Sequence, residues 1–206
     1  MRQSTENEVR IALVRHARSS HVHAGWIDAR GFRAWREAYE AAAIRDDELV
    51  PAPLEELASR GGVVISSDAP RALASARMLA NGREVVVSPL LRELHLEGPA
   101  LGGLRLPLGA WAVAVGGRTL LQTLRGQYPS AAEAARIEGA ASWIEELAAQ
   151  HSPVIAVTHA MFRRRLAARL AEAGWQPVPG RRSVRPWSAW LFTVARPGNP
   201  TLLRGT

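Results

Sequence analysis

The sequence of 206 residues contains no cysteine and no lysine. The first absence excludes disulfides, thiolate metal sites and a cysteine nucleophile, and it is compatible with a reducing cytoplasm. The second excludes a lysine-based phosphate loop and Schiff-base chemistry, because both need a side-chain amine. All 26 basic residues are therefore arginine.

Long apolar runs are also scarce. The longest near the middle of the chain covers residues 106–117, between Arg105 and Arg118, and is shorter than the roughly 20 residues that a membrane-spanning helix needs. The N-terminus is polar, so no secretory signal is expected. We expect a cytoplasmic protein without membrane contacts. With 47% hydrophobic residues, it should fold as a single domain over residues 1–206, with residues 1–8 as a flexible N-terminal segment.

Acidic residues are almost absent from residues 158–187, although the chain as a whole carries a formal charge of +7. In this segment Glu172 stands alone against seven arginines, which are Arg163, Arg164, Arg165, Arg169, Arg181, Arg182 and Arg185. Nucleic acid could bind such a segment, but we favour a solvated helix face followed by a basic loop. Nucleic acid is therefore not an expected partner, whereas anionic substrates would be attracted. Whether the chain forms a homodimer stays open.

Two short apolar runs end in histidine. Residues 11–15 precede His16, and residues 154–158 precede His159. Each run is typical of a buried parallel strand, and ligands bind at the carboxyl ends of such strands. Two imidazoles and the adjacent Arg15 could therefore meet over one ligand. The combination indicates phosphoryl transfer through a histidine nucleophile.

The apolar periodicity predicts strands that alternate with helices. The expected strands cover 9–15, 63–65, 84–87, 154–158 and an edge strand at 187–194, and the expected helices cover 32–43, 53–60, 68–79, a helix from 130 and 161–173. Asp68 is the expected N-cap of the third helix, and Ser130 with Glu133 forms a capping box. Residues 89–127 have no clear assignment, because proline and glycine interrupt them. The alternation predicts an α/β single-domain three-layer sandwich with a mostly parallel sheet and helices on both faces.

Four motifs occur in order along this framework. They are Leu13-Val14-Arg15-His16-Ala17-Arg18-Ser19, Ser66-Ser67-Asp68-Ala69-Pro70-Arg71, Leu91-Arg92-Glu93-Leu94 and Val157-Thr158-His159-Ala160. Together they resemble the signature of the histidine phosphatase superfamily, which has the phosphoglycerate-mutase-like fold. The sequence departs from the family pattern at Ala17 and Ala160, where the family has glycine, and at Arg18, where it has an acid. The methyl groups of Ala17 and Ala160 would narrow the site.

The resemblance implies a role for each of these side chains. His16 would be the nucleophile and carry the phosphoryl group, and Arg15, Arg71 and His159 would bind the phosphoryl oxygens. Glu93 would give a proton to the leaving group and later take one from water, although Glu97 and Asp28 stay open as donors. Ser19 could bind phosphate or cap the turn. No metal and no cofactor is expected, because arginines would neutralise the charge, and His21 with His23 lacks a third metal ligand.

The variable segments after the first and third motifs should form the substrate pocket. Asp28, Trp26 and Trp111 are its candidate lining residues, although both tryptophans could simply pack in the core. These segments show no cluster of extra basic residues for a second phosphate. This favours a metal-independent phosphomonoesterase with a small phosphorylated substrate. The alternatives are a phosphoglycerate-type mutase and a catalytically weak relative that binds a phosphorylated ligand.

Overall fold

A computed structural model describes residues 10–22, 25–180 and 182–193. Its main sheet has six strands in the order β4-β3-β6-β1-β8-β7. The strands are β1 (Ile11–Arg15), β3 (Val63–Ser66), β4 (Val85–Val87), β6 (Val154–Thr158), β7 (Gln176–Pro177) and β8 (Ala189–Thr193). The first four pair in parallel, whereas β8 is antiparallel to β1 and β7 to β8. The mostly parallel sheet is confirmed.

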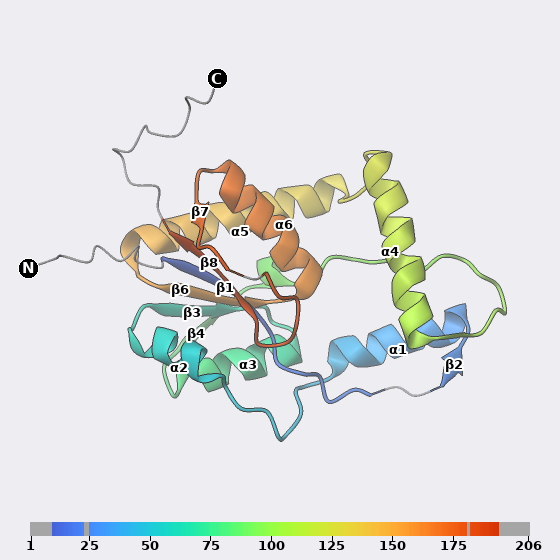
Figure 1. Ribbon diagram of the computed structural model, residues 1–206, viewed down its shortest axis with the longest axis horizontal. Helices are drawn as coiled ribbons and strands as arrows, with labels where there is room; N and C mark the ends of the chain where they lie inside the picture. The colour runs from blue at the N-terminus through green and yellow to red at the C-terminus, as the bar shows by residue number, and fades with distance from the viewer. Residues whose placement is uncertain (1–9, 23–24, 181, 194–206) are drawn as a thin grey trace, which may run out of the picture.

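Two helices cover each face of this sheet (Figure 1). Helices α5 (Ala131–Gln150) and α6 (Ala160–Glu172) cover one face, and α2 (Ala52–Ser59) and α3 (Pro70–Ala80) cover the other. Successive side chains of β1 alternate between them, because a strand turns each next residue to the opposite face. Ile11 and Leu13 pack in the cluster of α5 and α6, and Ala12 and Val14 in that of α2 and α3. This is the predicted three-layer sandwich.

Two more helices lie to one side of the three layers, near the carboxyl end of β1 (Figure 1). They are α1 (Ala29–Ala41) and α4 (Leu108–Leu124), and they accompany a small sheet of β2 (Trp26–Ile27) and β5 (Leu106–Pro107). The stacked rings of Phe32 and Trp111, 4.8 Å apart and inclined by 9°, join α1 to α4. A separate small core therefore stands beside the strand ends.

Helix α4 explains the segment that the sequence left unassigned. Gly109, Gly116 and Gly117 lower its helix propensity, and no side chain caps its N-terminus. Packing of Trp111 and Val115 against α1 stabilises the helix instead. The sequence shows no local signal for this contact.

Other boundaries were partly wrong. Ser130 and Glu133 do form the capping box, but the N-cap of α3 is Ala69, because Asp68 pairs with Arg92 at 2.5 Å. The last strand is β8, and it is not at the edge, because the short β7 pairs beyond it. Residues 1–8, Val9 and Val194, which the predictions included, lie outside the described residues. Within the described ranges, no helix is both long and apolar enough to cross a membrane.

Candidate functional site

Three neighbouring strands bring the candidate site together at their carboxyl ends. β1 pairs with β6 so that Arg15 lies opposite Thr158, and the next residue of each strand is a histidine. The rings of His16 and His159 are consequently 5.2 Å apart. β3 is the other neighbour of β6, and its last residue is followed by Ser67. Two imidazoles and a hydroxyl thus meet where ligands bind in α/β sheets.

The hydrogen bonds of His16 define its tautomer. Its Nδ1 lies 2.6 Å from the carbonyl oxygen of Ala17, which can only accept, so Nδ1 carries the proton. Nε2 therefore keeps its lone pair, and Arg71 Nε donates to it at 3.3 Å. Burial lowers the pKa of His16 from 6.5 to about 3. The hydrogen bond to the Ala17 carbonyl opposes this decrease, and the charges of Arg71 and Arg15 add to it. His16 is a neutral imidazole whose unprotonated Nε2 accepts from Arg71.

His159 is neutral as well, with the opposite tautomer. Arg71 Nη2 lies 3.2 Å from its Nδ1, and because a guanidinium only donates, Nδ1 is the acceptor. Its Nε2 then carries the proton and donates to Ser67 Oγ at 3.0 Å. Burial lowers the pKa of His159 well below its usual range, and the neighbouring His16 and Arg71 act in the same direction. An anion between the two rings would raise both pKa values.

Arg71 links the two histidines and is itself 1% exposed. Its Nη1 donates to the carbonyl oxygens of Tyr39 and Glu40 at 3.0 and 3.2 Å, and its Nη2 donates to Glu40 Oε2 at 2.9 Å. The Tyr39 ring lies 4.5 Å from the guanidinium carbon. With the bonds to His16 and His159, each of the five N–H groups of Arg71 has an acceptor. Sequence reasoning missed Tyr39 and Glu40 as neighbours of the site, because they lie on α1.

Arg15 has a backbone partner in this structure, and its predicted contact with phosphate stays a prediction. Its guanidinium donates to the carbonyl oxygen of Val184, because residues 182–188 fold back over the end of β1. Trp187 N donates to Arg15 O at 3.1 Å, and Arg15 N donates to Ser188 O at 3.0 Å. The structure therefore does not bring Arg15 into hydrogen-bond contact with the histidines, although its charge contributes to the low pKa of His16.

Glu93 lies at the positive N-terminal end of α6. One carboxylate oxygen accepts from the backbone of Leu94 and Phe162 at 3.0 and 2.7 Å, and the other accepts from Met161 at 3.2 Å. Burial raises the pKa of Glu93, whereas these backbone donors and then Arg15 oppose the rise. The result is a carboxyl group that holds its proton more tightly than a free glutamate does.

Arg136 of α5 holds the segment that carries Glu93. It donates to the carbonyl oxygens of Leu90, Arg92 and Glu93 at 2.9, 2.7 and 3.3 Å. Its guanidinium also lies over the Phe162 ring, 4.7 Å from the centroid. Sequence reasoning did not find this positioning residue, because nothing local distinguishes Arg136 from other helix arginines.

The other candidates have partners or exposure of their own, and no hydrogen bond joins them to His16 or His159 within the described residues. Ser19 Oγ accepts from His21 N at 3.2 Å, as a turn cap does. Asp28 caps α1 through Gly31 N at 2.8 Å, at the opposite end from Glu40 and roughly 18 Å from it along the helix. Glu97 pairs with Arg118 at 2.8 Å, and Trp26 is 63% exposed.

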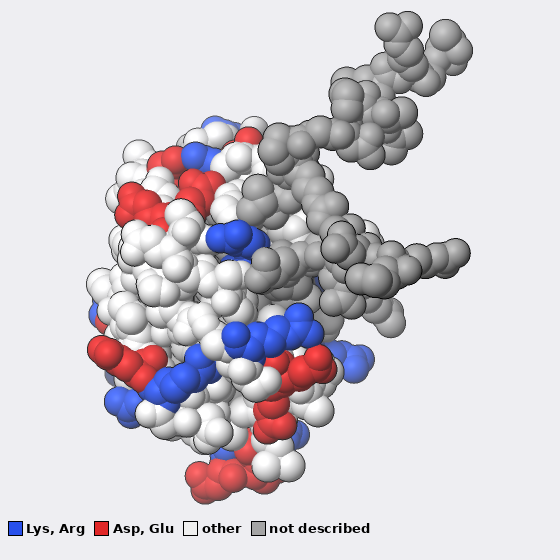
Figure 2. Space-filling view, turned by 90° about the vertical axis from the view of Figure 1, so that its left-hand side faces the viewer, with Lys and Arg blue, Asp and Glu red and all other residues white. Residues whose placement is uncertain are grey.

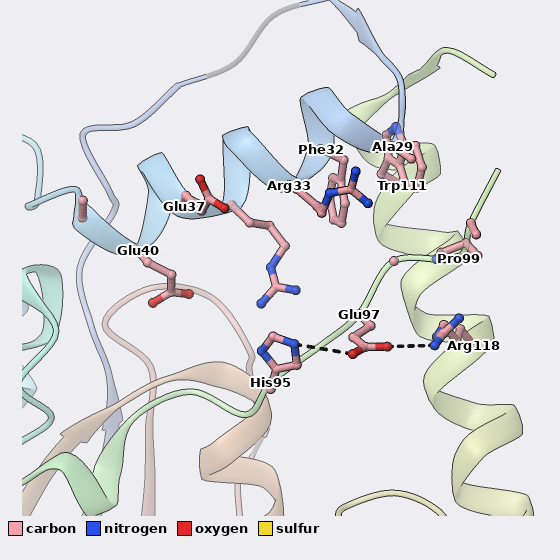
Figure 3. Close-up of a pocket in the computed structure, with 14 residues that line it drawn as sticks. Ala29, Phe32, Arg33, Glu37, Glu40, His95, Glu97, Pro99, Trp111 and Arg118 are labelled. Atoms are coloured by element: carbon pink, nitrogen blue, oxygen red, sulfur yellow. Dashed lines mark hydrogen bonds and ion pairs between the residues drawn. The ribbon is translucent and has the colours of Figure 1, made fainter. Parts of the chain in front are cut away.

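Two adjoining cavities lie beside the Glu93 segment, and neither is lined by His16, Arg71 or His159. The inner cavity, of about 380 Å³, is lined by Glu93 and its neighbours. The outer cavity, of about 810 Å³, lies between α1, residues 95–100 and α4 (Figure 3). In Figure 3 Glu40 lies toward one end and Trp111 toward the other. Both cavities share Arg36, Glu40 and His95.

The outer cavity corrects the expectation that no extra basic residues surround the pocket. Arg33, Arg36 and Arg118 all line it. The first two lie on the face of α1 that turns toward α4, at a spacing of one helical turn. The sequence could not reveal them, because they follow the expected pocket segments and lie on a helix whose exposed face was not assigned. Trp111 both lines this cavity and packs in the small core.

No group of three or more potential metal ligands occurs among the described residues. His21 packs against the Trp35 ring at 5.7 Å. Its sequence neighbour in the candidate metal pair, His23, lies outside the described residues.

The arginine-rich segment is partly used inside the fold. Arg163 is fully buried, donates to Ser183 O at 2.9 Å and to Ser188, and stacks over Trp190 at 4.5 Å. Arg169 pairs with Glu138. The face in Figure 2 shows acidic and basic side chains next to one another.

Replacement of Arg163 by methionine is expected to lower the free energy of unfolding by about 2–4 kcal/mol. The variant leaves the carbonyl oxygens of Ser183 and Ser188 without this donor. Denaturant titration measures the change, with exposed Arg164→Met as the control that should stay within about 0.5 kcal/mol of the wild type. Equal stabilities of the two variants would contradict a structural role for Arg163.

The sequence matches no protein-family model, and a search of curated proteins gives no significant match. Solved structures do match. A structure described as mycobacterial hydrolase 1 has 20% sequence identity and a TM-score of 0.56, over 90% of this chain and 97% of the other. A protein from Thermus thermophilus has 21% identity and a TM-score of 0.50, over 90% of this chain and 99% of that one.

A mycobacterial glucosyl-3-phosphoglycerate phosphatase is similar at 20% identity and a TM-score of 0.49, over 80% of each chain. The similarity to the solved structures shows the phosphoglycerate-mutase-like fold. The resemblance that the four motifs carry is thus confirmed at the level of the fold.

Proposed function

We propose that this protein is a metal-independent phosphomonoesterase of the histidine phosphatase superfamily, acting on a small phosphorylated metabolite through a phosphohistidine on His16. One observation carries the proposal. Two neutral, buried imidazoles stand 5.2 Å apart at adjacent strand ends, and a single arginine donates to both. This arrangement offers a nucleophilic nitrogen and fixed donors for the oxygens of a phosphoryl group.

The reaction needs two displacements at phosphorus. In the first, the lone pair of His16 Nε2 forms the N–P bond while the ester P–O bond breaks, and Glu93 gives its proton to the leaving oxygen. In the second, Glu93 takes a proton from water, whose oxygen attacks phosphorus, and the N–P bond breaks to release phosphate. Arg71 and His159 would stabilise the equatorial oxygens in both steps. A carboxyl group with a raised pKa suits both roles.

The cavities provide room for the alcohol part of the substrate. Glu93 lines the inner cavity, so a leaving oxygen beside Glu93 would place the rest of the alcohol there and in the outer cavity. Phe32 and Trp111 offer apolar surface in the outer cavity, and Arg33 and Arg36 offer positive charge.

The first test is steady-state hydrolysis of 4-nitrophenyl phosphate in the presence of EDTA. In the second, the reaction with phosphorus-labelled substrate is quenched rapidly without acid, and the labelled phosphate bound to the protein is measured. We expect steady turnover and one acid-labile phosphate per chain during turnover. No turnover with any aryl phosphate would reject the enzyme and leave a protein that only binds phosphorylated ligands.

A phosphoglycerate-type mutase is the second candidate, and the three arginines around the outer cavity favour it. A mutase must hold a second anionic group while the phosphoryl group moves. Exchange of the phosphoryl group between the two hydroxyl positions of a phosphoglycerate would identify it, whereas release of inorganic phosphate alone would support the phosphatase.

A further inference from the structure

The C-terminal end of α1 supplies most of the acceptors for the Arg71 guanidinium. Three of the five acceptors of this guanidinium belong to α1, namely the carbonyl oxygens of Tyr39 and Glu40 and the carboxylate of Glu40. The other two are the imidazoles of His16 and His159. A phosphoryl group that binds Arg71 must therefore replace one of these acceptors.

The carboxylate of Glu40 is the acceptor most suited to leave. A carboxylate and a phosphoryl group present similar oxygens to the planar fork of an arginine. The side chain of Glu40 is 47% exposed, whereas that of Arg71 is 1% exposed. Water can take up the carboxylate, but the buried cation cannot remain without an anionic partner except at high cost.

Arg36 is placed where it could pair with the displaced Glu40 carboxylate. It precedes Glu40 by one helical turn, a spacing at which side chains on a helix surface meet. Both residues line the inner and the outer cavity. Within the described residues, the side chain of Arg36 forms no hydrogen bond and no ion pair, whereas Arg118, which also lines the outer cavity, is already paired with Glu97.

We propose that Glu40 is a positioning residue that holds Arg71 between the two histidines, and that an entering phosphoryl group displaces the Glu40 carboxylate from Arg71 toward Arg36. The inference rests on the proposed function, because it concerns the same phosphate site. Glu40 keeps the buried guanidinium paired and aligned while the site is empty. It also competes with phosphate, and so it favours release of the product.

The test measures binding of inorganic phosphate by calorimetry to the wild type, Glu40→Gln and Glu40→Ala. Loss of the competing charge should tighten phosphate binding by about tenfold or more. In turnover, KM and kcat should both fall, because phosphate binds better and leaves more slowly. A purely structural role of Glu40 would weaken phosphate binding instead. Unchanged or weaker binding by both variants overturns the proposal.

A double-mutant cycle tests the part played by Arg36. Arg36→Ala should weaken phosphate binding about threefold to tenfold, because the displaced carboxylate loses its second partner. In the Glu40→Ala background the same change should have no effect. If Arg36→Ala weakened phosphate binding equally in both backgrounds, the proposed movement of the Glu40 carboxylate from Arg71 to Arg36 would be overturned. Exposed Arg30 on the same helix lines neither cavity, so Arg30→Ala is the matched control and should bind phosphate like the wild type.

Phosphate binding is measured without turnover, so the result for Glu40 is independent of whether the protein hydrolyses esters. If the Glu40 variants bind phosphate more tightly but the protein hydrolyses no ester, the proposed function is rejected and the role of Glu40 is supported. Normal hydrolysis with unchanged phosphate affinity in both Glu40 variants would reject the role of Glu40 alone.

Discussion

His16→Ala is expected to lose roughly 10⁴- to 10⁶-fold in kcat for 4-nitrophenyl phosphate while its circular dichroism and unfolding midpoint remain close to those of the wild type. The substitution removes the atom that would form the N–P bond, and the remaining donors can only bind the substrate. Acid-labile labelled phosphate should appear on the wild type and be absent from the variant. His151→Ala, at the exposed end of α5, is the matched control and should retain full activity.

The pH dependence of the same reaction gives an independent check on the nucleophile. In the free protein, burial lowers the pKa of His16 to about 3, so its Nε2 stays unprotonated from neutral pH down to about pH 4. The second-order rate constant for phosphoenzyme formation at low concentrations of the aryl ester reports the free protein, and it should not fall between pH 7 and pH 5 through loss of the nucleophile. A decline centred near the ordinary histidine pKa of about 6.5 would contradict the buried, neutral His16. Substantial turnover by His16→Ala would reject the covalent mechanism.

Glu93→Gln is expected to slow the hydrolysis of alkyl phosphates by about 10²- to 10⁴-fold, the usual contribution of a general acid. An alkoxide needs a proton to leave, whereas 4-nitrophenolate leaves without one. Rapid-quench measurement of phosphoenzyme formation should therefore show a much smaller loss with the nitrophenyl ester. Glutamine retains the shape of the side chain, so its amide oxygen can still accept from the backbone of Phe162 at the start of α6.

The raised pKa of Glu93 gives a second test of its role as the general acid. Burial raises this pKa, so the protonated donor persists to higher pH than it would in a free glutamate. The alkyl-ester rate should fall as the pH rises through the raised pKa, and this descent should vanish in Glu93→Gln. Equal slowing of both esters would count against Glu93 as the acid. Full activity would redirect the search to Glu97, since Asp28 caps the far end of α1.

The strands that carry the two histidines were predicted well, because their signal is local. A buried parallel strand is an uninterrupted apolar run, and β6 coincides with the predicted range 154–158. The capping box of Ser130 and Glu133 is also a local pattern, with both partners within one helical turn. Helix α4 escaped prediction, because its stability comes from Phe32 and other residues far away in the sequence.

The roles of the site residues remain predictions, and the structure places them unequally. His16, His159 and Arg71 meet at the strand ends. Arg15 instead contacts the carbonyl oxygen of Val184, since a long side chain beside a strand end can turn toward either the site or a covering loop. Adjacency in the sequence determined its position on β1 but not the direction of its guanidinium.

The sequence by itself determined which chemistry this protein could perform and where its strands would present it. Without cysteine or lysine, imidazole is the nitrogen nucleophile available, and two apolar strands ending in His16 and His159 place it at one edge of a parallel sheet. Tertiary structure alone decided what surrounds these groups. The contact of Glu40 with Arg71, the hydrogen bonds of Arg136 to the Glu93 segment and the cavity between α1 and α4 join residues distant in sequence. Such contacts depend on how helices pack, and no local spacing of residues encodes them.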